Sequence, residues 1–240
     1  MKKTITITCL ILATFQLSTA QNTMIGGNPA KGIDMNTAPF GIVSAFGTAE
    51  KVTTGSKYLY DNWKIGTIQL QQGEIKNCPV NIDLKNHVIE MNTDNGVRVL
   101  AVSRIERLVV GLPNIDQQVF ENAKKYNGAQ AQIAGLVEVL VNNETTLLKY
   151  NYSFVREGDY NAALAMGNNE TKHVLKSKYF LHKEGKLVEI PTSRKKFIKN
   201  FPDASQKKIQ NFFDETRLNL KKQDDLIAVC EFINDKKLTF

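Results

Sequence analysis

The sequence predicts an α+β fold, an antiparallel β-meander or sandwich with a small C-terminal helical cap. Three observations support this class. Apolar and polar residues alternate over much of residues 57–190, short turn motifs separate the alternating runs, and the apolar period becomes helical after Pro191. Of the 240 residues, 42% are hydrophobic and 23% are charged, a composition that excludes a disordered or collagen-like chain.

The first 20 residues have the three parts of a secretory signal peptide. Two lysines precede an apolar stretch, residues 5–17, and Ser18-Thr19-Ala20 forms a small-residue cleavage site. The stretch is shorter than the roughly 20 residues that a membrane-spanning helix needs, and no later segment reaches that length. We therefore expect an exported protein without a transmembrane span, periplasmic, outer-membrane-associated or secreted, whose mature chain begins near Gln21.

Residues 21–56 are rich in Gly, Ala, Thr and Asn and predict a loosely ordered leader. The β domain follows over residues 57–190, and its strongest hairpin signal is Asp94-Asn95-Gly96. We expect its first strands to bury one alternating apolar face, which comprises Ile68, Leu70, Cys78, Val80, Ile82, Leu84, Ile89, Met91, Val97, Val99 and Ala101.

A second group of strands follows in the same domain. Residues 114–126 between the two groups fit a helix and a strand equally well, so both alternatives stay open. Residues 159–170 predict an exposed loop. The alternating apolar positions of this group are Val137, Val139 and Val141, then Leu148, Tyr150, Tyr152 and Phe154, and then Leu175, Tyr179 and Leu181.

Residues 191–240 predict the helical cap. Ser193 is placed to begin a first helix, Asp203 and Gln206 have the spacing of a capping box for a second, and Asp224 and Asp225 suit the first turn of a third. The apolar stripes need a partner surface, which the sheet supplies; they contain Phe197, Ile209, Phe212, Phe213, Leu226, Val229, Cys230 and Ile233.

Most of the net positive charge lies in the helical cap. Without the two lysines of the signal peptide the formal charge falls from +7 to +5, and residues 191–240 hold eleven Lys/Arg against seven Asp/Glu. Solvation of the polar helix faces explains this pattern, but such a surface can also contact anionic envelope lipid or polysaccharide. The candidate contact surface consists of Lys195, Lys196, Lys199, Lys207, Lys208, Lys221 and Lys222.

Two further groups of residues have both a structural and a functional interpretation. Tyr58, Tyr60 and Trp63 form the densest aromatic cluster, which we expect to anchor a strand in the core; the alternative is an exposed platform for sugar rings or a membrane surface. Cys78 and Cys230 remain after export, where a disulfide is permitted. Their apolar neighbours favour two buried free thiols instead.

The sequence contains no motif for a cofactor, a metal or a catalytic nucleophile. His87, His173 and His182 lack tight ligand spacing, and phosphate-binding glycine loops and the G-x-S-x-G elbow are absent. Carboxylates that pair only in the fold remain an open alternative. We expect no nucleic-acid partner, because an exported protein rarely meets one and no aromatic residues alternate with the lysines of the cap.

Four segments carry a resemblance to known proteins: Thr53–Trp63, Lys186–Ile190, Phe201–Asp203 and Lys221–Ile227. They resemble a group of uncharacterised, exported β-rich proteins of Gram-negative bacteria that have a C-terminal helical block. The resemblance implies export and the order of strands followed by helices, and it transfers no catalytic residue. We therefore expect a non-enzymatic secreted or cell-envelope interaction or structural module, whose partner could be another envelope protein; the alternative is an envelope hydrolase or ligand carrier.

Overall fold

The computed structural model describes residues 53–71, 73–113, 115–128, 132–160, 163–164, 166–168 and 170–240. These residues belong to one compact unit, Thr48–Phe240. The predicted signal peptide, residues 1–20, and the predicted leader as far as residue 52 lie outside the described residues. Thr53 and Thr54, near the end of the predicted leader, form a short strand of the sheet.

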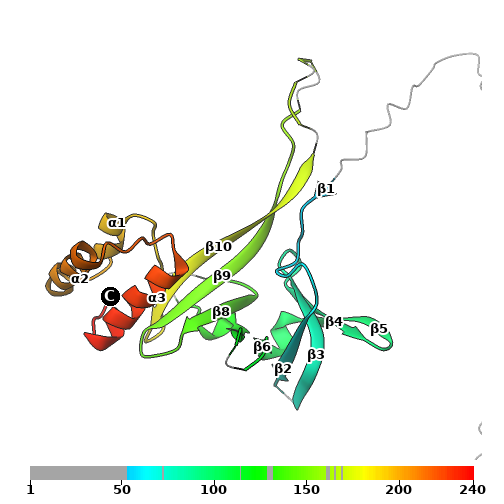
Figure 1. Ribbon diagram of the computed structural model, residues 1–240, viewed down its shortest axis with the longest axis horizontal. Coiled ribbons are helices and arrows are strands. Elements are labelled where there is room, and N and C mark those ends of the chain that lie inside the picture. The colour runs from blue at the N-terminus through cyan, green and yellow to red at the C-terminus, as the bar shows by residue number, and fades with distance from the viewer. Residues whose placement is uncertain are drawn as a thin grey trace, which may run out of the picture. The chain divides into compact units, whose positions relative to one another are not determined.

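Eleven strands of the described chain form one sheet, and three helices follow them (Figure 1). This arrangement confirms the predicted α+β class with a C-terminal helical cap. The strands are β1 (Thr53–Thr54), β2 (Lys64–Leu70), β3 (Gly73–Asp83), β4 (Val88–Thr93), β5 (Gly96–Ala101), β6 (Ile105–Val110), β7 (Gln118–Asn122), β8 (Leu136–Val141), β9 (Thr146–Arg156), β10 (Thr171–Lys183) and β11 (Lys186–Glu189), and the helices are α1 (Arg194–Ile198), α2 (Asp203–Thr216) and α3 (Gln223–Asp235).

The strand order is β1-β10-β9-β8-β7-β6-β2-β3-β4-β5, with β11 paired to β10. Consecutive strands pair antiparallel as a meander from β2 to β5 and again from β6 to β11. Between these runs, β6 pairs with β2 rather than with β5. Burial explains this return, because Ile105 and Leu108 of β6 share a core cluster with Ile68 of β2.

Residues 114–126, for which the sequence left helix and strand open, contain β7 and then a short 3-10 helix at Ala123–Lys125. Strand pairing with β6 and β8 decided between the two alternatives.

Three clusters of buried apolar side chains form the core. The first lies among β2 to β7, the second is centred on Val137, Leu148 and Phe180, and the third lies between the helices and the sheet. Cys78 belongs to the first cluster and Cys230 to the third, and both are buried free thiols. The two sulfurs therefore do not form a disulfide, in agreement with the apolar neighbours of both residues.

The prediction that Val97, Val99 and Ala101 belong to the buried face is wrong. Val97 is 53% exposed and Val99 is 63% exposed. The register explains the error: buried Ile89 of β4 lies opposite Leu100, so Leu100 shares the core face. The neighbours of Leu100 along β5 then point to the other face, because side chains alternate along a strand.

The helices cover one part of the sheet, and α3 contacts β8 and β9. Asn234 of α3 holds the turn between these two strands, since its side chain accepts from the Thr145 amide at 2.8 Å and donates to the Thr145 carbonyl at 2.9 Å. Within the described residues, no helix is both long and apolar enough to cross a membrane.

The predicted N-cap of α2 is wrong by one residue. Pro202 is the N-cap, and Asp203 lies in the first turn. The fixed φ of proline is compatible with this position, where no N–H is required. The Gln206 side chain donates to the Phe201 carbonyl at 2.9 Å and to Asp203 at 3.2 Å.

Candidate functional site

The predicted aromatic cluster is divided between different contacts. The Tyr58 hydroxyl donates to Glu90 on β4 at 3.0 Å, whereas the Tyr60 hydroxyl donates to Gln118 on β7 at 2.9 Å. Burial raises the pKa of Tyr60, with a further contribution from the charge of Glu138. Trp63 is 39% exposed. The two tyrosines thus connect the segment before β2 to the sheet, and their hydroxyls are engaged there.

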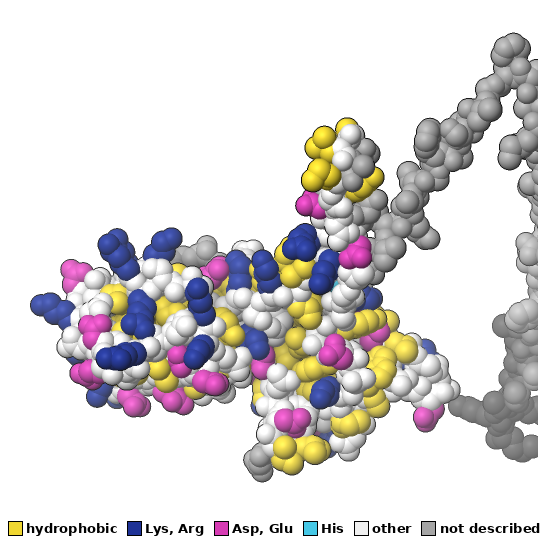
Figure 2. All heavy atoms as spheres, turned by 45° about the horizontal axis from the view of Figure 1, so that its top comes forward, with side chains coloured by type: hydrophobic (Ala, Val, Ile, Leu, Met, Phe, Trp, Pro, Cys, Tyr) yellow, Lys and Arg dark blue, Asp and Glu magenta, His cyan; other side chains and the backbone are white. Residues whose placement is uncertain are grey.

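All seven lysines of the candidate contact surface are exposed. Lys195, Lys196 and Lys199 lie on or just after α1, Lys207 and Lys208 lie on α2, and Lys221 and Lys222 precede α3. On the face shown in Figure 2, acidic side chains lie among the basic ones over the helical cap, to the left of the view. The cap therefore presents mixed charge on this face.

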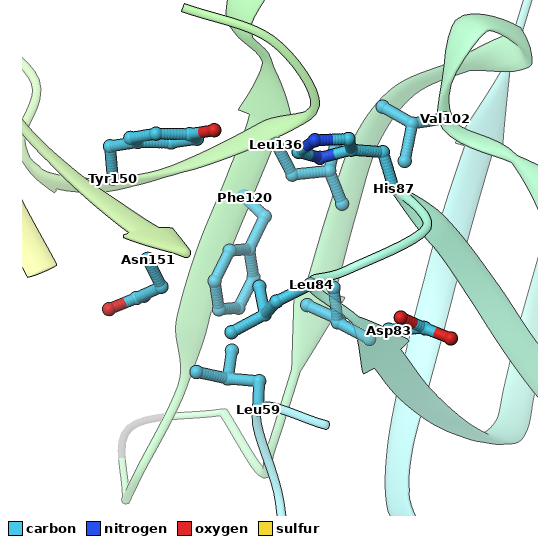
Figure 3. A pocket seen from close by; sticks show the side chains of 10 residues that line it. Leu59, Asp83, Leu84, His87, Val102, Phe120, Leu136, Tyr150 and Asn151 are labelled. Carbon is cyan, nitrogen blue, oxygen red and sulfur yellow. The ribbon is translucent and has the colours of Figure 1, made fainter. Parts of the chain in front are cut away.

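One enclosed cavity of the described residues is small and mostly apolar (Figure 3). It has room of about 10 Å³, which is the space for one water molecule. Leu59, Leu84 and Phe120 lie close together among its lining residues, and the Asp83 carboxylate points away from them. His87 also lines the cavity. No organic substrate fits in this volume.

Asp83 is a buried acid with a structural set of partners. Its carboxylate accepts from the Lys57 ammonium at 2.6 Å, from the amides of Lys85 and Asn86 at 3.0 and 2.9 Å, and from the Asn86 side chain at 2.8 Å. Burial by itself would raise the pKa of Asp83, but Lys57 and Asn86 outweigh burial and lower it. The carboxylate therefore stays ionised and holds the turn between β3 and β4.

Glu138 of β8 is the other acid in the described residues with a buried side chain. It accepts from Gln118 at 2.8 Å, and its second oxygen lies 3.4 Å from the Lys149 ammonium. Lys149 also donates to Gln223 of α3 at 2.9 Å. These contacts form a polar chain from Tyr60 to α3. Asp83 and Glu138 each have a lysine partner, and Lys57 also lies 3.9 Å from Glu90.

Two of the three histidines, His173 and His182, lie nine residues apart on β10, and the third precedes β4. His87 is in the turn before β4, His173 lies 3.4 Å from the Ser153 hydroxyl, and the His182 ring packs edge-on against Tyr126. Burial lowers the pKa of His182, and the charge of Lys125 lowers it further. Among the described residues, no group of three His, Cys, Asp or Glu side chains could hold a metal ion.

The β9–β10 hairpin carries a surface that combines cations with aromatic rings. Lys172 lies opposite Arg156, Lys176 opposite Tyr152 and Lys178 opposite Tyr150. Opposed residues of an antiparallel pair share a face of the sheet. We call this surface the basic aromatic face, and it consists of Tyr150, Tyr152, Phe154, Arg156, Lys172, Lys176 and Lys178.

An open groove of about 650 Å³ lies at the end of the basic aromatic face that contains Tyr150 and Lys178. The rings of Tyr150 and Tyr152 are stacked, with centroids 5.8 Å apart and planes 17° from parallel. Burial raises the pKa of Tyr150. The groove is comparable in volume to small-molecule sites, and its lining is Gln132, Ile133, Ala134, Tyr150, Tyr152, Lys178, Phe180 and Glu189.

The sequence analysis identified the aromatic alternation in β9 but not the basic aromatic face. The three lysines that complete it lie on β10, and only the pairing register shows that they share a face with the tyrosines. The residue at which β10 begins decides which of its side chains lie opposite the tyrosines. The sequence does not show that residue, because β10 follows the predicted loop at residues 159–170.

Comparisons with known proteins identify no relative of this chain: no family model, curated protein or solved structure matches it.

Proposed function

We propose that this protein is a non-enzymatic interaction module of the bacterial cell envelope that contacts its partner through open surfaces. The observation that carries this proposal is the filled interior of the described chain. The enclosed cavity lined by Leu84 and Phe120 has space for one water, and the carboxylate beside that cavity is bound by Lys57 and Asn86. The sheet therefore serves as a scaffold for surfaces.

The alternative is an envelope hydrolase or ligand carrier with a site built across the sheet. Such a protein needs a deep pocket with convergent acids or histidines. Among the described residues, one of the larger hollows is an open groove that combines Glu106, Arg107, Glu121, Lys124 and Lys125. In this groove Lys125 forms an ion pair with Glu121 at 2.6 Å, so the two charges neutralise each other. The observations favour the interaction module.

The envelope location rests on the predicted signal peptide, residues 1–20, and on the resemblance to exported proteins. Two surfaces are available for a partner within the described residues: the seven lysines of the helical cap and the basic aromatic face. The first has acids among its lysines, whereas the second has aromatic rings among its cations.

The test is to express the full chain in a Gram-negative host and to measure the intact mass of the protein recovered from the envelope or the medium. We expect a mature chain that begins within one residue of Gln21, because the signal should end at Ala20. A variant with Ala20→Arg should retain the leader and serve as the control. A native chain that keeps Met1 and stays in the cytosol would contradict the envelope proposal.

A further inference from the structure

We propose that the basic aromatic face binds an anionic polysaccharide. This inference rests on the proposed function and names the ligand class for one of its surfaces. Three features carry it: the aromatic rings that line the groove, the cations that surround them, and the length of the hairpin over which both extend.

The aromatic rings match the faces of sugar rings. A pyranose has a flat C–H face and a rim of hydroxyl groups, and a tyrosine has an apolar ring with a polar tip. Tyr150 and Tyr152 both line the 650 Å³ groove. Their hydroxyls form no hydrogen bond to any other described residue, so both are available to a ligand. The pair can therefore stack on a sugar and bond to its rim.

The charges of this face match an anionic ligand. Arg156 and Lys172 lie directly opposite each other across the hairpin, where like charges repel. Asp159, just beyond β9, interacts with Arg156 and offsets part of this repulsion. Lys176 lies 4.9 Å from the centre of the Phe154 ring and remains exposed. In the described register of β9, β10 and β11, Glu189 is the single acid on this side. Carboxylates of a polymer would offset the repulsion.

The ion pair at the groove can also open to a ligand. Lys178 lies 3.1 Å from Glu189, and the two side chains are 44% and 50% exposed. Exposed ion pairs contribute little to stability, so a ligand carboxylate can replace Glu189 at low cost. Lys178 thus offers a cation beside the two tyrosines.

The face is long enough for a polymer. From Tyr150 to Arg156 the strand rises by roughly 20 Å, at about 3.3 Å per residue. Over this length the residues pair only with β10 within the sheet, because β8 pairs with β9 no further than Lys149. Several sugar units can therefore lie along the hairpin.

Single-stranded nucleic acid also binds surfaces that combine cations with aromatic rings. The predicted signal peptide favours the polysaccharide, because an exported protein meets envelope glycans rather than nucleic acid. The free tyrosine hydroxyls favour it as well, since sugars are rich in hydrogen-bonding groups. An oligonucleotide is therefore included as a competing probe.

The test is affinity electrophoresis of the mature native chain with three probes: polygalacturonate, neutral dextran and a dT20 oligonucleotide. We expect retardation by polygalacturonate, at least a tenfold weaker effect of dextran, and weakening as salt rises. Lys176→Gln with Lys178→Gln, and separately Tyr152→Ala, should weaken the binding of polygalacturonate at least tenfold. Lys64→Gln with Lys76→Gln in β2 and β3, which lie outside both candidate surfaces, removes the same charge and should leave binding within twofold.

Thermal unfolding of each variant separates lost binding from lost folding. The Lys176→Gln with Lys178→Gln variant changes exposed residues and should unfold at the same temperature as the native chain. It therefore tests the inference even if Tyr152→Ala does not fold. Unchanged binding by the Lys176→Gln with Lys178→Gln variant, stronger binding of dT20, loss of binding in the control in β2 and β3, or no retardation of the native chain by polygalacturonate would each overturn the inference. A mature native chain in the envelope would then leave the proposed function standing, whereas retention with Met1 in the cytosol contradicts the proposed function itself.

Discussion

At the scale of single residues, buried charges are the groups whose role depends most on their partners. Asp83 has a side chain that is 1% exposed, and it bonds to Lys57, to two backbone amides and to the Asn86 side chain. Burial of an ionised carboxylate is costly unless such partners compensate for it. Sequence alone places Asp83 before a turn, but only the fold brings Lys57 to it from 26 positions away.

Asp83→Asn should therefore destabilise the protein by about 1–3 kcal/mol at neutral pH, because the ion pair is lost while part of the turn bonding remains. The folded-state pKa of Asp83 is lowered below its ordinary value of 3.8, so its contribution is complete above about pH 5 and decreases as pH falls through 3.8. Urea unfolding at several pH values measures this. A stability difference between native and variant that stays constant from pH 6 to pH 2.5 would contradict the assignment.

At the scale of elements, one polar chain connects the sheet to the helical cap. Glu138 on β8 lies opposite Lys149 on β9, and Lys149 reaches Gln223 at the start of α3. The Glu138 and Lys149 side chains are 6% and 21% exposed. Removal of one member of a buried ion pair leaves the other charge without compensation, whereas removal of both is far less costly.

Lys149→Met should lower the free energy of unfolding by about 3 kcal/mol, because Glu138 then stays buried without its cation. The double variant Glu138→Gln with Lys149→Met should recover at least half of that loss. The comparison requires urea unfolding of both variants, with Lys176→Gln as an exposed control that changes stability by less than about 0.5 kcal/mol. Equal losses in the single and double variants would show that the pair does not stabilise the link.

At the scale of the whole molecule, the two cysteines report on two separate parts of the core. Cys78 lies in the cluster among β2 to β7, and Cys230 lies on the buried face of α3, where its thiol is 3.4 Å from the Thr145 carbonyl. Burial raises the pKa of Cys78, and burial together with the charge of Glu231 raises that of Cys230 to about 12. Both thiols are therefore protonated and inaccessible in the folded chain.

The mature native protein should react slowly with a thiol reagent at pH 8, and denatured, non-reduced protein should react with two equivalents. Mass spectrometry of partly labelled protein identifies which cysteine reacts first. Labelling of Cys230 before Cys78 would indicate that the helical cap opens before the sheet. Absence of reactive thiols in denatured, monomeric mature protein would instead demonstrate a disulfide and contradict the structure.

The sequence by itself determined the fold class and the positions of most elements. Period-two alternation marked the strands around Ile68, Val80 and Leu148, and the helical stripes marked Ile209 and Ile233 as buried. These signals are local, because alternation and helical periodicity each arise from the geometry of a single element. Apolar neighbours likewise indicated that Cys78 and Cys230 are buried.

Only the tertiary structure decided how the elements pair and which surfaces result. The return of β6 to β2, the opposition of Leu100 to Ile89, and the ion pair between Glu138 and Lys149 all depend on register between strands. A shift of one residue exchanges the two faces of a strand, and the alternation within a single strand does not show which residues of its partner lie opposite. For the same reason the basic aromatic face exists only once β9 and β10 have paired, since its rings and cations come from both strands.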